Sequence, residues 1–420
     1  MQAAEYADHL SPKMSKLTTV FRLTTPFRQA VFYTLLFAGT GASLPFMPLW
    51  LKTHGMTSGQ IGLILAVPLL LRAVTGPLSG VWADRFTLYR TPIMILAAGG
   101  ASFYLLINLG TVFPPVRFAA YLVLFTLGFS CVNAASPLID AMTLQLARRD
   151  SFAYAIPRAA GSAAFIVTNI ILGFLLVFLP SDAIVIWMIV AALAAAFGAR
   201  YLLGAEARVD APLGDQPRPS GLTRVLFLMR NKGFVLLVIA VGCMQAAHSF
   251  YYAFSTIIWK ERGLSSSTCG YLWATGVACE IAFMAFGEGL RRRLGPWRLL
   301  ILAGLCGIVR WTAMMALPPV WLLWPLQLLH AMTFAGAYLA GLDLVHRLTP
   351  KGYEGLAQTL NAAYTSGLLL GIGTLASGAV YAAFGARGYG LMSGIVLVGL
   401  ASAVWLYIER DKLTAAVSTK

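Results

Sequence analysis

The sequence predicts an all-α membrane protein in which twelve transmembrane helices form two pseudo-symmetric six-helix halves. Its composition is the first observation behind this prediction: 59% of the 420 residues are hydrophobic and 11% are charged, against roughly 45–50% and 25% in soluble domains. The second observation is that the apolar residues fall into runs long enough to cross a bilayer. The third is that a polar linker divides the chain into two parts that resemble each other.

Each predicted span is an apolar run of about 20 residues, the length that a helix needs to cross the hydrocarbon core. The twelve runs lie near residues 29–51, 58–82, 91–112, 117–145, 154–179, 182–204, 234–259, 267–290, 297–317, 320–346, 355–382 and 386–408. The preceding residues 1–28 are polar and basic and have no apolar core. They are predicted to be a cytosolic tail rather than a cleaved signal peptide.

The distribution of basic residues predicts the orientation. The net charge is +15, which by itself would suggest binding to nucleic acid. However, only five of the 31 Lys and Arg residues fall in the loops expected outside the cell, and three lie within spans. The remainder fall on the opposite side, which is the positive-inside pattern. The sequence therefore predicts a bacterial inner-membrane protein with both termini in the cytosol and no nucleic-acid partner.

A Pro-rich, charged linker separates the spans six and six. The expected domains are the tail 1–28, the N-terminal bundle 29–204, the linker 205–233, the C-terminal bundle 234–408 and a cytosolic tail 409–420. The stretch WLKTHGMTSGQIG at 50–62 resembles WKERGLSSSTCG at 259–270, with matching residues 208 positions apart. Parallel six-span repeats of this kind are typical of transporters whose substrate site lies between the halves.

The loop after the second span reads GVWADRFTLYR, residues 80–90. Gly80, Asp84, Arg85 and Arg90 in it resemble the cytoplasmic loop signature of the major facilitator superfamily, although the glycine usual after the Asp-Arg pair is missing. Together with the spans, the linker and the repeat, this resemblance covers the whole chain. It implies the major facilitator fold and a gating role for the loop on the cytosolic side. The alternative is that Asp84 and Arg85 only solvate a tight turn.

Two opposite charges lie inside the fourth and fifth spans. Asp140 and Arg158 are centred on residue 149, in the turn that joins these spans, so they lie at equal depth in the membrane. A charge at the bilayer centre costs about 2.5–3.5 kcal/mol on insertion scales. We therefore expect the two side chains to face each other, either in the substrate pathway or as a structural clamp of the hairpin.

Four further ionisable residues share one depth in spans seven to ten. Arg310 and His330 are equidistant from an external turn, which places both about 15 Å deep at 1.5 Å per residue, near the midplane. Glu280 and Arg310 are equidistant from a cytosolic loop, and His248 and Glu280 are equidistant from an external loop, so the same rule assigns Glu280 and His248 to this depth. Equal depth predicts proximity but not contact, because the rotation of each helix is unknown. His248 is equally well explained as a buried residue that is hydrogen-bonded to a neighbour.

Arg72 in the second span is the 208-residue equivalent of Glu280. The pseudo-symmetry of the halves therefore predicts that both side chains face the central cavity. The alternative for Arg72 is that its long side chain extends to the cytosolic surface, although it lies about ten residues from the end of its span at 1.5 Å per residue.

The surroundings of these charges carry a narrower resemblance. The stretch SPLIDAM…RRDSFAYAIPRAAG resembles the hairpin of spans four and five in the lactose permease family, where an acid and an arginine with this separation bind the sugar. GIVRW and LQLLH match the same family, but Thr333 replaces the proton-carrying acid beside the histidine. A closer likeness, over QAAHSFYYAFSTIIW, GYLWATGVACE, GIVRW and LQLLH, is to the phenylpropionate permease group. This resemblance implies uptake of aromatic acids with protons.

We therefore expect proton-coupled uptake of a small organic carboxylate, aromatic or another monocarboxylate, by alternating access. The deep arginines outnumber the deep acids, and arginine suits carboxylate ligands. Glu280 is expected to carry the proton, with Arg310 and His330 tuning it. The residues expected to bind substrate are Asp140, Arg158, Arg72, His248, Tyr252, Trp273 and Trp311.

Other functions are less well supported by the sequence. The alternatives are a proton symporter of an oligosaccharide or nucleoside and, less favoured, a drug–proton antiporter, because span five lacks the Gly-Pro signature expected of that group. An enzyme is not expected, since no metal-ligand spacing, nucleophile elbow or phosphate loop occurs outside the spans. The proton gradient would supply the energy, without a cofactor or metal. The expected partners are the solute, protons and membrane lipid, with the chain acting as a monomer.

Overall fold

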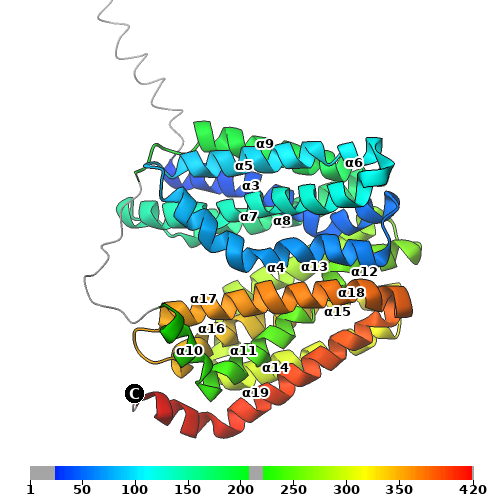
Figure 1. Cartoon of the computed structure of the whole chain (residues 1–420). Coiled ribbons are helices and arrows are strands. Elements are labelled where there is room, and N and C mark those ends of the chain that lie inside the picture. The colour runs from blue at the N-terminus through cyan, green and yellow to red at the C-terminus, as the bar shows by residue number, and fades with distance from the viewer. Residues whose placement is uncertain (1–23, 208–220, 419–420) are drawn as a thin grey trace, which may run out of the picture.

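The computed structural model describes residues 24–207 and 221–418, and over these ranges the chain is helical apart from short connections and one isolated β-bridge between Leu88 and Ala207. Most of the expected N-terminal tail and residues 208–220 of the expected linker lie outside the described residues. The helices form two packed groups, drawn one above the other in Figure 1.

The first group contains the helices that correspond to the first six apolar runs. They are α3 (Thr25–Thr53), α4 (Ser58–Ala83), α5 (Arg90–Leu106), α7 (Arg117–Arg149), α8 (Ala155–Leu175) and α9 (Ala183–Tyr201), with the short α6 (Leu109–Val112) and a 3-10 turn (Pro114–Val116) between α5 and α7. The predicted and observed bounds agree to within a few residues, because apolar length decides where these helices end.

The second group contains more breaks than the sequence suggested. After α10 (Gly221–Met229), the helices are α11 (Lys232–Ala246), α12 (Ser249–Glu261), α13 (Ser266–Phe286), α14 (Glu288–Met315), α15 (Val320–Leu328), α16 (Ala337–Leu348), α17 (Glu354–Ala362), α18 (Leu370–Phe384) and α19 (Tyr389–Ser418). π-Helical segments, Ala331–Gly336 and Ala363–Leu369, join α15 to α16 and α17 to α18. Such π segments are frequent at functional sites.

Fewer than twelve helical segments of the described residues have the length and composition of a membrane span. In the described residues, nine helical segments are long and apolar enough to cross a bilayer, or ten if the two parts of α4, bent by 52°, form one span. One of the nine, residues 354–415, includes two predicted spans, and α5 is a shorter apolar helix. The chain is therefore a multi-pass membrane protein, while the count of twelve, the domain limits and the orientation stay predictions.

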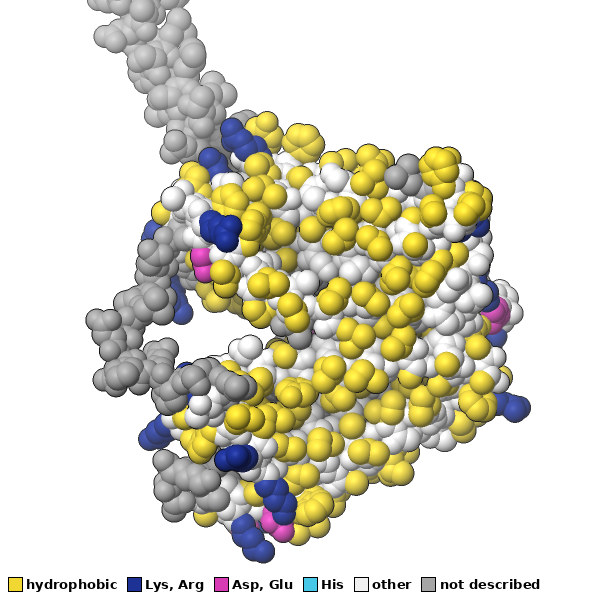
Figure 2. Space-filling view, viewed as in Figure 1, with side chains coloured by type: hydrophobic (Ala, Val, Ile, Leu, Met, Phe, Trp, Pro, Cys, Tyr) yellow, Lys and Arg dark blue, Asp and Glu magenta, His cyan; other side chains and the backbone are white. Residues whose placement is uncertain are grey.

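The two groups touch closely at the end of the molecule that is expected to be external. There α8 packs against α13, and α4 packs against α18. A Cβ atom on Gly270 would lie 2.2 Å from the Asn169 carbonyl oxygen, and one on Gly378 would lie 2.6 Å from that of Ser58. Only glycine permits such backbone approaches. At the other end, where α8 and α17 begin, Figure 2 shows a hollow between the groups.

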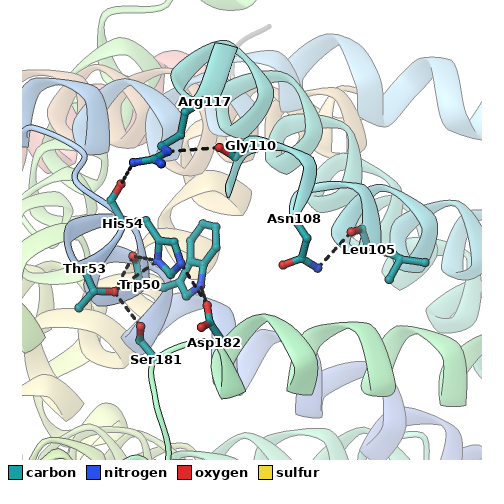
Figure 3. A network of polar contacts seen from close by, with 9 residues as sticks. All are labelled: Trp50, Thr53, His54, Leu105, Asn108, Gly110, Arg117, Ser181 and Asp182. Atoms are coloured by element: carbon teal, nitrogen blue, oxygen red, sulfur yellow. Dashed lines mark hydrogen bonds and ion pairs between the residues drawn. The ribbon is translucent and has the colours of Figure 1, made fainter. Parts of the chain in front are cut away.

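A polar network links the expected external end of α3 to other parts of its own group (Figure 3). His54 Nε2 lies 3.0 Å from Asp182 Oδ1, and Nδ1 lies 2.9 Å from the Trp50 carbonyl oxygen. Trp50 Nε1 donates to the same Asp182 oxygen at 3.0 Å. Arg117 holds the adjoining turn through the His54 carbonyl oxygen.

A second contact joins the two groups at this end. Lys52 Nζ and the Glu261 carboxylate form an ion pair, and the Tyr381 hydroxyl donates to Glu261 Oε2 at 2.6 Å. These residues come from α3, α12 and α18. Closed contacts at one end and a hollow at the other describe a conformation open toward the expected cytosolic side.

Candidate functional site

The Asp140 carboxylate on α7 is held by two tyrosines. Its Oδ1 accepts hydrogen bonds from the Tyr33 hydroxyl on α3 at 2.5 Å and from the Tyr154 hydroxyl at 2.9 Å. The Tyr33 side chain is fully buried. Two O–H donors on one carboxylate oxygen are charge-assisted bonds, and they stabilise a charge that hydrocarbon alone would disfavour.

Arg158 on α8 lies over aromatic rings. Its guanidinium carbon is 4.4 Å from the Phe37 ring centroid and 5.9 Å from that of Tyr33. Among the residues that the structure describes, no carboxylate oxygen lies within 4.0 Å of its nitrogens. Gly161, one turn along, leaves room here, since an added Cβ would lie 3.0 Å from the Phe37 ring and 3.5 Å from Arg158 Nη1.

The expected direct pairing of Asp140 with Arg158 is therefore not present in this conformation. Both side chains instead contact Tyr33, Asp140 at the hydroxyl and Arg158 at the ring face. Asp140 and Arg158 are equally far from the hairpin turn, but Tyr33, which belongs to α3, contacts both of them. Tyr33, Phe37 and Tyr154 were missed by the sequence analysis, because aromatic residues in apolar runs are ordinary membrane packing.

Arg310 on α14 forms the centre of the second cluster. The side chain is fully buried. Nη1 donates to His330 Nδ1 and to Thr333 Oγ1, both at 3.0 Å, and Nη2 donates to Gln327 Oε1 at 3.0 Å. The guanidinium carbon also lies 4.5 Å from the Trp311 ring centroid. Five fixed donors let one arginine serve several acceptors at once.

His330 connects this cluster to Glu280 on α13. Arginine can only donate, so Nδ1 of His330 accepts and the proton of the neutral ring is assigned to Nε2. Nε2 lies 3.6 Å from Glu280 Oε2, and the Glu280 side chain is 18% exposed while that of His330 is 7% exposed. The predicted neighbours Arg310, His330 and Glu280 thus form a row from the buried interior to a partly accessible carboxylate.

His248 lies on the other side of Thr333, at the break between α11 and α12. Its backbone N–H donates to the Gln245 carbonyl oxygen, and its Nδ1 lies 3.1 Å from the Met244 carbonyl oxygen. Carbonyl oxygens only accept, so Nδ1 carries the proton and Nε2 accepts from Thr333 Oγ1 at 3.2 Å. His248 is fully buried, so the structure places it behind Arg310 as a hydrogen-bonded interior residue.

Thr333 and Gln327 are cluster members that the sequence analysis did not assign. Thr333 was noted only for lacking a carboxylate, yet its hydroxyl links Arg310 to His248. Gln327 Oε1 accepts from both Arg310 and the Tyr251 hydroxyl, each at 3.0 Å. Their signal was available: both stand three residues from His330 in an apolar span, which is one helical turn.

The aromatic residues expected around the substrate form packed walls. Trp311 is fully buried and Trp273 is 3% exposed. Trp273 Nε1 donates to Thr256 Oγ1 at 3.0 Å. The Tyr252 ring, which is half-buried, stacks on Trp273 at a centroid distance of 5.9 Å. In this conformation only Tyr252 of the three is partly accessible, and a substrate role for the tryptophans stays a prediction.

Arg72 joins neither cluster. It lines a small cavity between α4 and α7, together with Phe129, Asn133 and Pro137. No hydrogen bond or ion pair of Arg72 with another described residue is present. Its expected place in the central site therefore stays a prediction.

The expected gating loop docks on its own half. Asp84 ends α4, and beyond it Tyr89 N–H donates to the Glu206 carbonyl oxygen at 3.2 Å. Arg149 Nη1 bonds the Glu206 carboxylate at 2.5 Å, and its side chain holds the pKa of the adjoining Asp150 below its usual range. The space around Gly80 is open, and Arg85 and Arg90 lie near this edge of the half. Gating by the loop stays a prediction.

The two clusters lie on helices that pack against each other across the boundary of the halves. α8, which carries Arg158, packs against α13, which carries Glu280. No group of three or more His, Cys, Asp and Glu side chains that could hold a metal ion occurs in residues 24–207 and 221–418.

Comparisons with known proteins show the family to which the chain is related. The model of the MFS_1 like family matches residues 27–389. The chain is 29% identical over 373 residues to a probable 3-phenylpropionic acid transporter of Escherichia coli (strain K12), covering 88% of this chain and 94% of the relative. It is also 29% identical over 358 residues to a maltose permease of Geobacillus stearothermophilus, covering 83% and 86%.

Solved structures show the same fold at lower identity. The nucleoside transporter NupG superposes with a TM-score of 0.73 and 16% identity, over 93% of this chain and 99% of that one. A bacterial homologue of the lysosomal transporter Spinster, in an inward-facing and unoccupied conformation, superposes with a TM-score of 0.65 and 14% identity, over 94% and 96%.

Proposed function

This chain belongs to the MFS_1 like family of membrane transporters, which are not enzymes, and we propose that it takes up a small monocarboxylate with an aromatic ring together with a proton. The substrate class is supported by Arg158, which has no carboxylate partner among the described residues, and by the relative in Escherichia coli, a probable 3-phenylpropionic acid transporter. Transport would follow alternating access, with the halves rocking about a site between Arg158 and Glu280.

The observation that carries the proposal is the environment of Arg158. Its guanidinium lies against the Phe37 and Tyr33 rings and has no carboxylate within 4.0 Å among the described residues. A carboxylate ligand would form a bidentate pair with the guanidinium, and its ring would pack beside Phe37. Asp140 is occupied by two tyrosine hydroxyls, so in this role it fixes Tyr33 rather than binding the anion.

Proton coupling would follow from competition between two carboxylates for Arg158. Because α8 packs against α13, an ionised Glu280 would be attracted to the Arg158 charge across the interface. A substrate carboxylate on Arg158 would remove that favourable interaction and repel the Glu280 charge, so the two anions disfavour each other. Protonation of Glu280 removes this conflict. One proton and one monocarboxylate would then cross together without net charge movement.

His330 is a poorer carrier than Glu280 in this arrangement. Its Nδ1 must be unprotonated to accept from Arg310 at 3.0 Å, and a charged ring would lose that bond and face a cation. The Nε2–H is directed toward Glu280. We therefore assign His330 the role of orienting Glu280, with Arg310 fixing the tautomer.

The second candidate is symport of a neutral, hydroxyl-bearing solute. It is favoured by the identity to the maltose permease, which equals that to the phenylpropionic acid relative. Such a solute would have to displace Tyr33 or Tyr154 from Asp140 to use that carboxylate. Competition assays separate the two candidates.

The test uses purified protein in vesicles with an imposed proton gradient and labelled 3-phenylpropionate. Uptake should be inhibited by other aromatic monocarboxylates but not by maltose or a nucleoside. Glu280→Gln should abolish uphill uptake yet keep exchange of labelled for unlabelled solute, because exchange needs no net proton movement. Asp411→Asn, at a side chain that is 86% exposed, is the matched control and should behave as wild type. Uphill uptake by Glu280→Gln, or inhibition by maltose alone, would overturn the proposal.

A further inference from the structure

A groove of about 590 Å³ runs along the outer surface between α5 and α9, away from the site described above. Its lining includes the small residues Ala98, Gly99 and Ala196. Phe197 and Tyr201, whose rings stack at 6.4 Å, form one wall and are 63% and 70% exposed. The groove is thus an apolar slot on the surface that faces lipid in a membrane protein.

The groove ends at a cation. Arg200, in the last turn of α9, lines it at the end where α9 finishes and α5 begins. Its guanidinium lies 5.3 Å from the Tyr201 ring centroid, and no carboxylate oxygen of the described residues lies within 4.0 Å. Arg90 stands one turn before Met94, another lining residue, and also has no ion pair within the described ranges. In Figure 2 several Lys and Arg side chains gather at this end of the upper half.

The length of the groove identifies what can fill it. On α5 it extends from Met94 to Ser102, which is about 12 Å at 1.5 Å per residue. This is less than half of the roughly 30 Å hydrocarbon core. A transmembrane helix from another chain would cover the whole thickness, whereas an acyl chain from one leaflet fits this depth.

We propose that the groove between α5 and α9 binds one anionic glycerophospholipid, with an acyl chain in the apolar slot and the phosphate on Arg200. Apolar walls take the chain, while an arginine without a carboxylate partner takes a phosphate through paired N–H donors. Basic sites between helices on the cytoplasmic side are suited to anionic head groups. The Ser102 hydroxyl does not conflict with an apolar ligand, because it donates to the Ala98 carbonyl oxygen at 3.0 Å.

Native mass spectrometry of the delipidated full chain tests this, with phosphatidylglycerol and phosphatidylcholine of identical acyl chains as the probes. One phosphatidylglycerol should bind at least tenfold more tightly than phosphatidylcholine. Arg200→Gln should remove this preference, and Ser102→Trp, which fills the slot from an exposed position, should weaken binding of both lipids. Arg387→Gln, in the connection at the opposite end, is the control and should bind as wild type.

Two results would overturn the proposal. One is equal binding of the two lipids to the wild type. The other is unchanged phosphatidylglycerol binding in both Arg200→Gln and Ser102→Trp. An unfolding midpoint equal to that of the wild type verifies that both variants are folded, since neither residue belongs to the transport site. The lipid site and the proposed substrate can therefore fail independently.

Discussion

Nδ1 of His330 lies 3.0 Å from Nη1 of Arg310, and the opposite ring nitrogen lies 3.6 Å from Glu280. This relationship orders the three residues from a fully buried cation to a partly accessible acid. It also fixes the tautomer of the neutral imidazole, because the arginine can only donate. We therefore expect proton transfer at Glu280 to depend on Arg310, a residue that does not contact it.

Replacing Arg310 should show this dependence. Arg310→Lys keeps the charge but cannot reproduce a planar fork that reaches three acceptors, so we expect at least a tenfold loss of uphill uptake. Arg310→Gln should in addition lower the free energy of unfolding by about 1.5–3 kcal/mol, the contribution of a hydrogen bond to a charged group. Vesicle uptake and thermal unfolding in detergent measure the two effects. Wild-type uptake by Arg310→Lys would show that the planar guanidinium with its several donors is not required.

Tyr33 contacts both Asp140 and Arg158, and a single substitution can remove one contact while keeping the other. Tyr33→Phe removes the bond to Asp140 but keeps the ring under Arg158. We expect a loss of about 1.5–3 kcal/mol in unfolding free energy with substrate affinity reduced less than in Arg158→Gln. The double variant Tyr33→Phe with Asp140→Asn should be less destabilised than the sum of the single variants, because both remove the same bond. Strict additivity would show that this bond contributes nothing.

The glycine contacts at the expected external end should control which side of the transporter is open. Gly62 and Gly270 are equivalent in the internal repeat, and each contacts the opposite half closely. Gly270→Trp cannot fit against the Asn169 carbonyl, so the halves should separate there and the hollow should close. Distances between spin labels at the two ends measure this shift. Gly394→Trp, at an exposed position on α19 where an added Cβ has no neighbour within 4 Å, is the control and should leave the distances unchanged.

The ion pair of Lys52 and Glu261 should contribute to the same closed end. Its side chains are 39% and 49% exposed, so its contribution to stability is about 0–1 kcal/mol. Lys52→Glu should nevertheless shift the label distances toward external opening, because it places two carboxylates together. Exchange of the charges, Lys52→Glu with Glu261→Lys, should reverse most of this shift, though the Tyr381 hydrogen bond is lost. A double variant as open as the single one would rule out a charge-pair role.

The sequence predicted the membrane helices and the depth at which their ionisable residues lie in the membrane. Apolar length sets where α4 and α7 begin and end, since each must cross the same hydrocarbon thickness. Equal spacing from the turn after α14 predicted that Arg310 and His330 share one depth, and in the structure the two side chains are in contact at 3.0 Å. Alternating charge in the loops predicted an orientation that no contact in the structure tests.

The tertiary structure decided which residues at one depth face each other. The same spacing rule applied to Asp140 and Arg158, yet these two side chains do not pair. The Tyr33 hydroxyl of α3 donates to Asp140, and the Tyr33 ring lies against Arg158. Thr333 and Gln327 became partners of Arg310 through the rotation of α15 and the π-helical segment after it. Spacing along a hairpin determines depth because the helical rise is constant. Rotation about each axis, and the third helix that packs on a pair, depend on side-chain packing between distant parts of the chain, which no local pattern specifies.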